Sequence, residues 1–315
     1  MEKVFYYKNL LYFYGLGGKF MKIANLFTKK KPTVSFEVFP PNEIYSLEEV
    51  FSVIDELALL KPDFISVTYG AGGASRGRTV EIASKIKNEN HIEALAHLTC
   101  IGAEQAEIES ILSELKENNI ENILALRGDF PKDKTNIKHG DFSHASDLVK
   151  FLKEKKDFSV GGAYYPEGHQ DTNDLLDLFN LKLKVEAGTD FLISQIFFDN
   201  EQFYQFRDKL RKLNINVPLI AGIMPVTNAK QIRKITSLCG CSIPEKLRKI
   251  LDKYENNPQA LKEAGIAYAT EQIIDLITSD IDGIHIYTMN KTETAKKIMD
   301  SIKNIRATLE LQEVV

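Results

Sequence analysis

Residues 94–129 read ALAHLTCIGAEQAEIESILSELKENNIENILALRGD, two short apolar runs with a helical stretch between them. The runs Ala94–Thr99 and Ile123–Arg127 have the length and continuous hydrophobicity of parallel strands that are buried on both faces. Between them, Glu104–Asn118 has apolar residues at spacings of 3, 4 and 7, which is typical of an amphipathic helix. A strand, a helix and a second strand in this order predict a βαβ unit with parallel strands.

This unit recurs along the chain. The other apolar runs are Val34–Phe39, Phe64–Tyr69, Val160–Tyr164, Phe191–Phe197, Val217–Ile223 and Gly283–Met289. The other helical stretches are Leu47–Leu60, Thr79–Lys87, Ser146–Lys155, Leu175–Ala187, Glu201–Leu213, Ala229–Leu238 and Thr292–Thr308. About eight such units close a (β/α)8 barrel rather than an open doubly wound sheet. The sequence therefore predicts an α/β fold of the TIM-barrel class.

The predicted barrel is one catalytic domain that covers residues 33–308. Before its last strand lies an additional helix pair, Ile243–Leu276, which is divided at Asn257-Pro258. Residues 309–315 are expected to form a C-terminal tail. Residues 1–32 are an N-terminal extension, read either as a surface tail or as the product of an upstream start, because Met21 opens an ordinary Lys-rich lead into the first strand.

Composition restricts the classes of partner. A net charge of −4 provides no large basic surface for nucleic acid, and no apolar stretch approaches the roughly 20 residues that cross a bilayer. Cys100, Cys239 and Cys241 are too few and too badly spaced for a disulfide framework. Without a second Cys/His cluster, neither a zinc site nor a redox pair is favoured at Cys239-x-Cys241. We expect a cytoplasmic protein with no bound metal that assembles as a homo-oligomer.

Polar residues stand at or just beyond the ends of the apolar runs. They are Glu37, Thr68, His97, Asp129, Tyr165, Gln195, Gln231 and Lys291. A (β/α)8 barrel collects the C-terminal ends of its strands on one face, where its active site lies. The sequence therefore predicts that these scattered residues surround one pocket.

Glu37 interrupts an otherwise apolar run that Pro40-Pro41 ends. Such a carboxyl group either points to solvent or sits in a dry pocket, where burial favours the protonated form that a general acid needs. The two prolines put Glu37 near the C-terminal rim of its strand, which favours the second interpretation.

Three other motifs have both a structural and a functional interpretation. Arg127 and Asp129 form either a local salt bridge or a ligand site in which the carboxylate lies under a ring and the guanidinium binds a phosphate or carbonyl. His97 and His169 are each typical of satisfied core histidines, and only a shared rim makes them functional candidates. The glycine-rich segment 70–74 lacks the spacing of a dinucleotide fingerprint and is expected to be a loop over the pocket.

The order of the motifs carries a family resemblance. From the N-terminus they are Ser35–Pro41 (SFEVFPP), Phe64–Gly70 (FISVTYG), His97–Cys100 (HLTC), Leu126–Asp129 (LRGD), Tyr165–His169 (YPEGH), Gln195–Asp199 (QIFFD) and Gly222–Val226 (GIMPV). Over residues 33–307 the chain resembles the bacterial 5,10-methylenetetrahydrofolate reductases, flavoproteins that make 5-methyltetrahydrofolate.

The resemblance implies a barrel that binds FAD, uses NADH or NADPH as cosubstrate and serves one-carbon metabolism and methionine biosynthesis. It implies that Glu37 is the general acid and that Asp129 is a catalytic residue beside the flavin and the pterin. The residues that match FAD contacts are Thr68, His97, Arg127, Gly128, Asp129, Tyr165, His169, Asp177, Asn180 and Lys184. The residues that match folate contacts are Glu37, Gln195, Gln231 and Lys291.

The chain differs from its relatives at three positions in or beside these expected ligand contacts. Leu183 stands where some relatives carry an arginine for the FAD phosphates, and Ile235 stands where an aromatic ring can stack on substrate or nicotinamide. Lys291 stands where an arginine can meet the glutamate tail of folate, so the charge is kept but the bidentate fork is lost.

Two alternatives remain open on the sequence. The chain is either reduced directly by a nicotinamide nucleotide or fed electrons by a partner redox protein, which would have to supply any iron–sulfur centre because the chain has no cysteine cluster of its own. A pterin-binding barrel that transfers a methyl group without flavin is a different class of function. It predicts a colourless protein, whereas a bound flavin is yellow.

Overall fold

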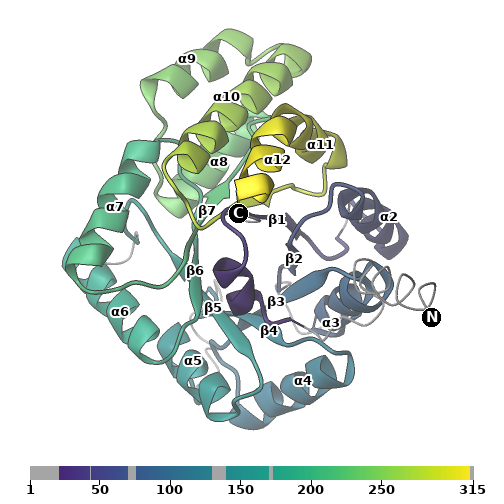
Figure 1. Cartoon of the computed structure of the whole chain (residues 1–315), viewed down its shortest axis with the longest axis vertical. Coiled ribbons are helices and arrows are strands. Elements are labelled where there is room, and N and C mark those ends of the chain that lie inside the picture. Colours follow the sequence, from purple (N-terminus) through teal and green to yellow (C-terminus); the bar gives the residue numbers. More distant parts are fainter. Residues whose placement is uncertain (1–20, 43, 70–75, 130–139, 170–172, 313–315) are drawn as a thin grey trace, which may run out of the picture.

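The computed structural model describes residues 21–42, 44–69, 76–129, 140–169 and 173–312, and its strands form a closed barrel (Figure 1). The strands are β1 (Thr33–Val38), β2 (Phe64–Val67), β3 (Glu93–Thr99), β4 (Asn122–Leu126), β5 (Ser159–Tyr164), β6 (Phe191–Ser194), β7 (Leu219–Ile223) and β8 (Gly283–Tyr287). They follow one another in sequence order, every neighbouring pair is parallel, and β8 pairs with β1. The predicted (β/α)8 barrel is confirmed. Residues 1–20 and the loop expected at residues 70–74 lie outside the described residues.

Helices surround the barrel on the outside (Figure 1). Those between or after the strands are α2 (Leu47–Ala58), α3 (Arg76–Ser84), α4 (Gln105–Glu117), α5 (Ala145–Glu154), α6 (Asp174–Glu186), α7 (Asn200–Lys212), α8 (Ala229–Cys239) and α11 (Thr292–Ser301). The predicted extra pair is α9 (Glu245–Tyr254) and α10 (Pro258–Thr278). The Asn257 side chain caps α10 by accepting from the N–H of Ala260 at 3.1 Å, and Pro258 occupies the first turn, where its missing N–H costs nothing.

Two helical stretches differ from the sequence prediction. After α3 the chain forms a π-helical turn, η3 (Lys85–Glu89), instead of continuing as an α-helix. The stretch predicted as one helix over Thr292–Thr308 comprises two, because α11 ends at Ser301 and α12 runs over Lys303–Gln312. Ile302 lies between them as the C-cap residue of α11, with its side chain fully buried.

The alternation of side chains along each strand divides the core into two parts. Outward-facing residues of β1, such as Val34 and Phe36, belong to the layer between strands and helices, together with Ile54 of α2. Inward-facing residues, such as Phe64 and Leu95, fill the barrel itself.

A short N-terminal helix, η1 (Ile23–Thr28), closes one end of the barrel (Figure 1). Ile23 and Phe27 are buried among the inward-facing apolar residues of the strands. The N–H of Ile23 donates to Oδ1 of Asn122 at 2.7 Å, and the N–H of Ala24 donates to Oγ of Ser159 at 3.2 Å. Asn122 and Ser159 begin their strands, so η1 covers the N-terminal face.

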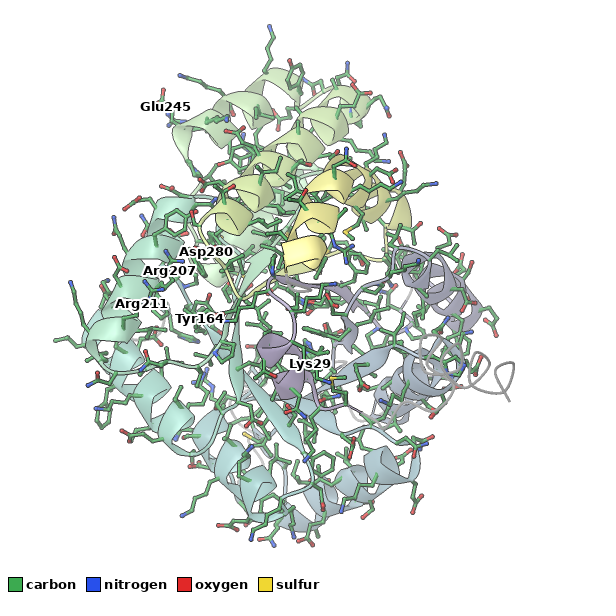
Figure 2. All side chains as sticks on the ribbon, in the orientation of Figure 1. Lys29, Tyr164, Arg207, Arg211, Glu245 and Asp280 are labelled. Atoms are coloured by element: carbon green, nitrogen blue, oxygen red, sulfur yellow. The ribbon has the colours of Figure 1, made fainter. Side chains whose placement is uncertain are left out.

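We predict that Phe27→Ala lowers the free energy of unfolding by about 3 kcal/mol, since truncating a buried phenylalanine costs roughly 3–5 kcal/mol. Lys29→Ala is the control, because Lys29 follows η1 and is exposed (Figure 2). Its effect should stay within about 0.5 kcal/mol. Urea unfolding measures both, and equal stabilities would show that η1 does not seal the barrel.

Candidate active site

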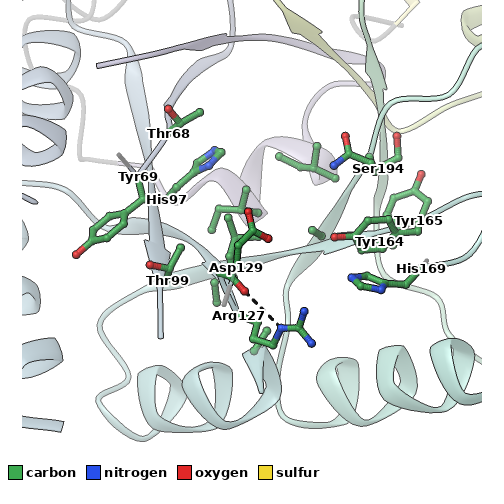
Figure 3. Close-up of a pocket in the computed structure, with 18 of the residues that line it drawn as sticks. Thr68, Tyr69, His97, Thr99, Arg127, Asp129, Tyr164, Tyr165, His169 and Ser194 are labelled. Carbon is green, nitrogen blue, oxygen red and sulfur yellow. Dashed lines mark hydrogen bonds between the residues drawn. The ribbon is translucent and has the colours of Figure 1, made fainter. Parts of the chain in front are cut away.

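A cavity of about 1350 Å³ lies at the C-terminal ends of the strands (Figure 3). It is larger than the ~300–1,000 Å³ of common small-molecule pockets, which leaves room for two ring systems. The sequence-predicted residues that line it are Glu37, Thr68, His97, Arg127, Gly128, Asp129, Tyr165, His169, Asp177, Asn180, Lys184 and Gln195. The barrel therefore brings these residues together, as its geometry predicted.

Two predicted residues are not among those that line the cavity. Gln231 lies in the first turn of α8, where its N–H donates to Oδ1 of the capping Asn228 at 2.9 Å. Lys291 precedes α11, and its Nζ donates to Oγ1 of Thr227 at 2.9 Å. Both follow strands β7 and β8, so they lie on the same face of the barrel but outside the cavity lining. Their predicted contacts with folate stay predictions.

Glu37 lies inside the barrel and not at the solvent surface. It is 6% exposed, and Thr288 Oγ1 donates to its backbone carbonyl at 2.6 Å. Its Oε2 is 3.5 Å from Nε2 of His97 and 3.7 Å from Nε2 of His285. One carboxyl oxygen thus lies within reach of two imidazoles that come from different strands.

His97 is neutral near neutral pH. Burial lowers its pKa from 6.5 to about 4, outweighing the opposite effect of the Glu37 charge, and the charge of His285 lowers it further. Its buried Nε2 has no hydrogen-bond partner among the residues that the structure describes. A buried nitrogen in this state favours a ligand that supplies the missing hydrogen bond.

Arg127, Gly128 and Asp129 follow β4 and line the cavity. Gly128 has φ +84°, and a Cβ there would lie 3.0 Å from Cβ of Thr99, so only glycine fits without strain. Arg127 Nε donates to the Gly128 carbonyl at 3.4 Å. Asp129 is exposed and lies between the His97 and Tyr165 sides of the cavity (Figure 3).

Helix α6 supplies the far end of the cavity. Asp177, Asn180 and Lys184 recur at spacings of three and four residues, which puts them on one face. Lys184 donates through Nζ to the carbonyl of Ala163, and burial lowers its pKa to about 8 despite the charge of Asp177. Burial also raises the pKa of Asp177, against the opposing charges of His169 and Lys184.

The aromatic and apolar walls complete the lining. Tyr165 and His169 meet edge to face, with ring centroids 4.6 Å apart. Met224, Ile235 and Met289 line the cavity with aliphatic side chains, so Ile235 occupies the wall where an aromatic ring was considered.

Sequence reasoning missed three buried residues, Ser35, Ser66 and His285, that surround Glu37 from inside the barrel. Tyr287, also missed, lines the cavity and donates from its hydroxyl to the Ser194 carbonyl at 2.7 Å. The available signal was the period of two. Each of the three buried residues stands two positions before a cavity-lining residue, so the two members of each pair face inward. The pairs are Ser35 with Glu37, Ser66 with Thr68, and His285 with Tyr287.

Within the described part of the chain, no group of three or more His, Cys, Asp or Glu side chains is arranged to hold a metal ion. The helices described by the structure include none with the length and apolar character that crossing a lipid bilayer demands.

We predict that His97 makes the free energy of unfolding decrease at acidic pH. Its pKa is about 4 when folded and 6.5 in the reference state, so the unfolded chain binds a proton between these values that the folded protein excludes. The stability that comes from keeping His97 neutral is fully present above the pKa of the unfolded chain. It is lost as the pH falls from that value to the pKa of His97 in the folded protein. Between about pH 6.5 and pH 5, the wild type should lose about 1.5 kcal/mol more than His97→Gln in urea unfolding. Equal losses would contradict the assignment.

Comparisons with known proteins show which family the chain belongs to. A sequence model of the family described as methylenetetrahydrofolate reductase matches residues 22–303. The 5,10-methylenetetrahydrofolate reductase of Pectobacterium carotovorum is 38% identical over 85% of this chain and 89% of its own length. "Methylenetetrahydrofolate reductase (NADH) 1" of Arabidopsis thaliana is 35% identical over 88% of this chain, which spans 49% of that longer protein.

Among solved structures, an uncharacterised Clostridium thermocellum protein that binds two copies of 5-methyl-5,6,7,8-tetrahydrofolic acid has a TM-score of 0.59. It is 15% identical and covers 91% of this chain and 100% of its own, which shows a shared fold. The family match carries more weight, because it spans residues 22–303, which include all eight strands of the barrel. The chain belongs to the methylenetetrahydrofolate reductase family.

Proposed function

We propose that this protein reduces 5,10-methylenetetrahydrofolate to 5-methyltetrahydrofolate, with hydride from reduced FAD that NADH or NADPH regenerates. The observation that carries the proposal is the buried carboxyl group of Glu37 at a cavity with room for two ring systems. Membership of the family supports the substrate class, and the Arabidopsis relative carries NADH in its name.

The residues around the cavity fit FAD. His97 offers a buried Nε2 without a partner among the described residues, and Lys184 offers a half-buried cation. Gly162 leaves space for Lys184, because a Cβ there would lie 3.0 Å from its Cδ. We assign the flavin end to Thr68, His97, Arg127, Gly128, Tyr165 and His169, and the ribityl, phosphate and adenosine parts to Asp177, Asn180 and Lys184. Bound FAD would supply the hydride.

Folate would occupy the part of the cavity next to Glu37. We assign the edge of the pterin to Gln195, whose Oε1 accepts from the N–H of Ile196 at 2.8 Å and whose amide N–H₂ is a donor for the ligand. Gln231 and Lys291 are assigned to the outer part of the substrate. There the ammonium group of Lys291 would meet the carboxylates of the glutamate tail.

Two carboxyl groups then divide the chemistry. Protonated Glu37 donates to N10 of the substrate, the C–N10 bond breaks, and the methylene carbon becomes part of an iminium cation at N5. Asp129 stabilises this cation electrostatically. Hydride addition to the methylene carbon completes the methyl group.

We predict that Glu37→Gln retains FAD and is reduced by the nucleotide at close to the wild-type rate, but reduces folate at least about 100-fold more slowly, as expected for a lost general acid. Anaerobic stopped-flow absorbance follows the two half-reactions separately. Glu117→Gln, an exposed position in the last turn of α4, is the control.

Other outcomes of that assay decide between functions. A colourless purified protein that transfers methyl groups would refute the flavin assignment. If neither NADH nor NADPH bleached the flavin absorbance, a partner redox protein would be the electron donor. Unimpaired folate reduction by Glu37→Gln would refute its role as the acid.

We predict that Lys184→Met raises the dissociation constant of FAD about 10- to 100-fold, the equivalent of a charge-assisted hydrogen bond. Lys182→Met is a matched control on the same helix, because Lys182 contacts Glu186 at the surface at 3.9 Å. Fluorescence titration of the apoprotein measures both constants, and equal values would remove Lys184 from the cofactor site.

A further inference from the structure

Glu37 is the top of a buried polar cluster inside the barrel. Below it, Ser35, Ser66 and His285 are each at most 1% exposed. Nδ1 of His285 lies 2.7 Å from Oγ of Ser35, and its Nε2 lies 3.2 Å from Oγ of Ser66 and 3.7 Å from Oε2 of Glu37. Polar groups this deep are costly unless they satisfy one another.

The hydrogen bonds of Ser35 assign the tautomer of His285. Its Oγ lies 3.2 Å from the carbonyl of Ile284, which can only accept, so the hydroxyl proton is used there. The contact with His285 is then a hydrogen bond only if Nδ1 carries the proton. In the neutral ring, Nε2 therefore presents a lone pair toward Ser66 and Glu37.

Within the part of the chain that the structure describes, few other charges act on this cluster. The described titratable groups that face His285 are Glu37 on β1, His97 on β3 and Tyr287 on β8 itself, whose ring meets that of His285 edge to face. Phe64 of β2 stacks on the other side. Burial keeps His97 neutral by lowering its pKa, and it keeps Tyr287 neutral by raising its pKa. The ionisation that matters here is that of Glu37 and His285.

These groups behave as a pair. A lone pair on Nε2 opposes an unprotonated Glu37, whereas a proton on either group gives an attractive contact, as an acid facing an acceptor or as an ion pair.

We infer that His285 is a positioning residue for the acid, because Glu37 and His285 hold one proton between them and so present Glu37 to the substrate in its protonated form. This inference rests on the proposed function, in which that proton moves to N10 of the folate. The step leaves the carboxylate beside a neutral imidazole, moves no electrons, and is reset by a proton from water in the cavity.

The kinetic test uses His285→Gln, which keeps a polar side chain of similar reach but cannot hold a proton. The alkaline limb of the single-turnover rate of folate reduction should move about one pH unit lower, so that the rate above it falls about tenfold. Reduction of the flavin by NADH should keep its rate. Phe64→Leu is the control, because it alters packing on the His285 ring and leaves the hydrogen bonds in place.

A double variant separates positioning from mere packing. If His285 acts through Glu37, Glu37→Gln/His285→Gln should reduce folate as fast as Glu37→Gln alone. Additive losses, or an unchanged pH profile in His285→Gln, would overturn the inference. Ser35→Ala removes the hydrogen bond that fixes the tautomer of His285 but keeps the imidazole. It should shift the alkaline limb in the same direction by a smaller amount. This variant provides the test if His285→Gln does not fold.

A spectroscopic test does not depend on turnover. The infrared band of a protonated carboxyl group should be present in the wild-type holoenzyme near neutral pH, absent in Glu37→Gln, and lost at lower pH in His285→Gln than in the wild type. A wild-type protein that shows this band but reduces no folate would refute the proposed function and keep the proton pair. Identical bands in the wild type and His285→Gln at every pH would refute the pair alone.

Discussion

The closure of eight parallel strands into a barrel is the constraint on which the rest of the structure depends. In a closed barrel, every second side chain of each strand points into one shared interior. Polar residues in that interior must therefore find hydrogen-bond partners on strands that are distant in sequence. At the N-terminal face, η1 fills this interior with Ile23 and Phe27. At the opposite face the strand ends carry the polar side chains that line the cavity.

The two ends of the cavity differ in the charge of the side chains that line them. Near β1 and β3, desolvation keeps His97 neutral, and the carboxyl group of Glu37 lies among imidazoles. Near α6, Lys184 keeps a cation beside Asp177, although burial lowers its pKa to about 8. One end suits proton donation to a neutral ring and the other suits an anionic group, and a single ligand with a ring at one end and phosphates at the other would fit both.

Local patterns were reliable where local physics decides the structure. The division at Asn257-Pro258 was predictable, because a capping side chain and a proline act within one helical turn. The break at Ile302 and the π-helical turn over Lys85–Glu89 were not, since the apolar period continues through both. The six residues of η1 are too few to show a period, so its role as the seal of the barrel was invisible.

The sequence by itself determined the order of strands and helices, and it determined which polar residues stand at the strand ends, because hydrophobic period and turn chemistry are local properties. It also marked Glu37 as the candidate acid. Only the tertiary structure decided that Glu37 points inward and that imidazoles from β3 and β8 face it. The physical reason is that β8 pairs with β1 only when the barrel closes, which brings His285 beside Ser35 across most of the chain.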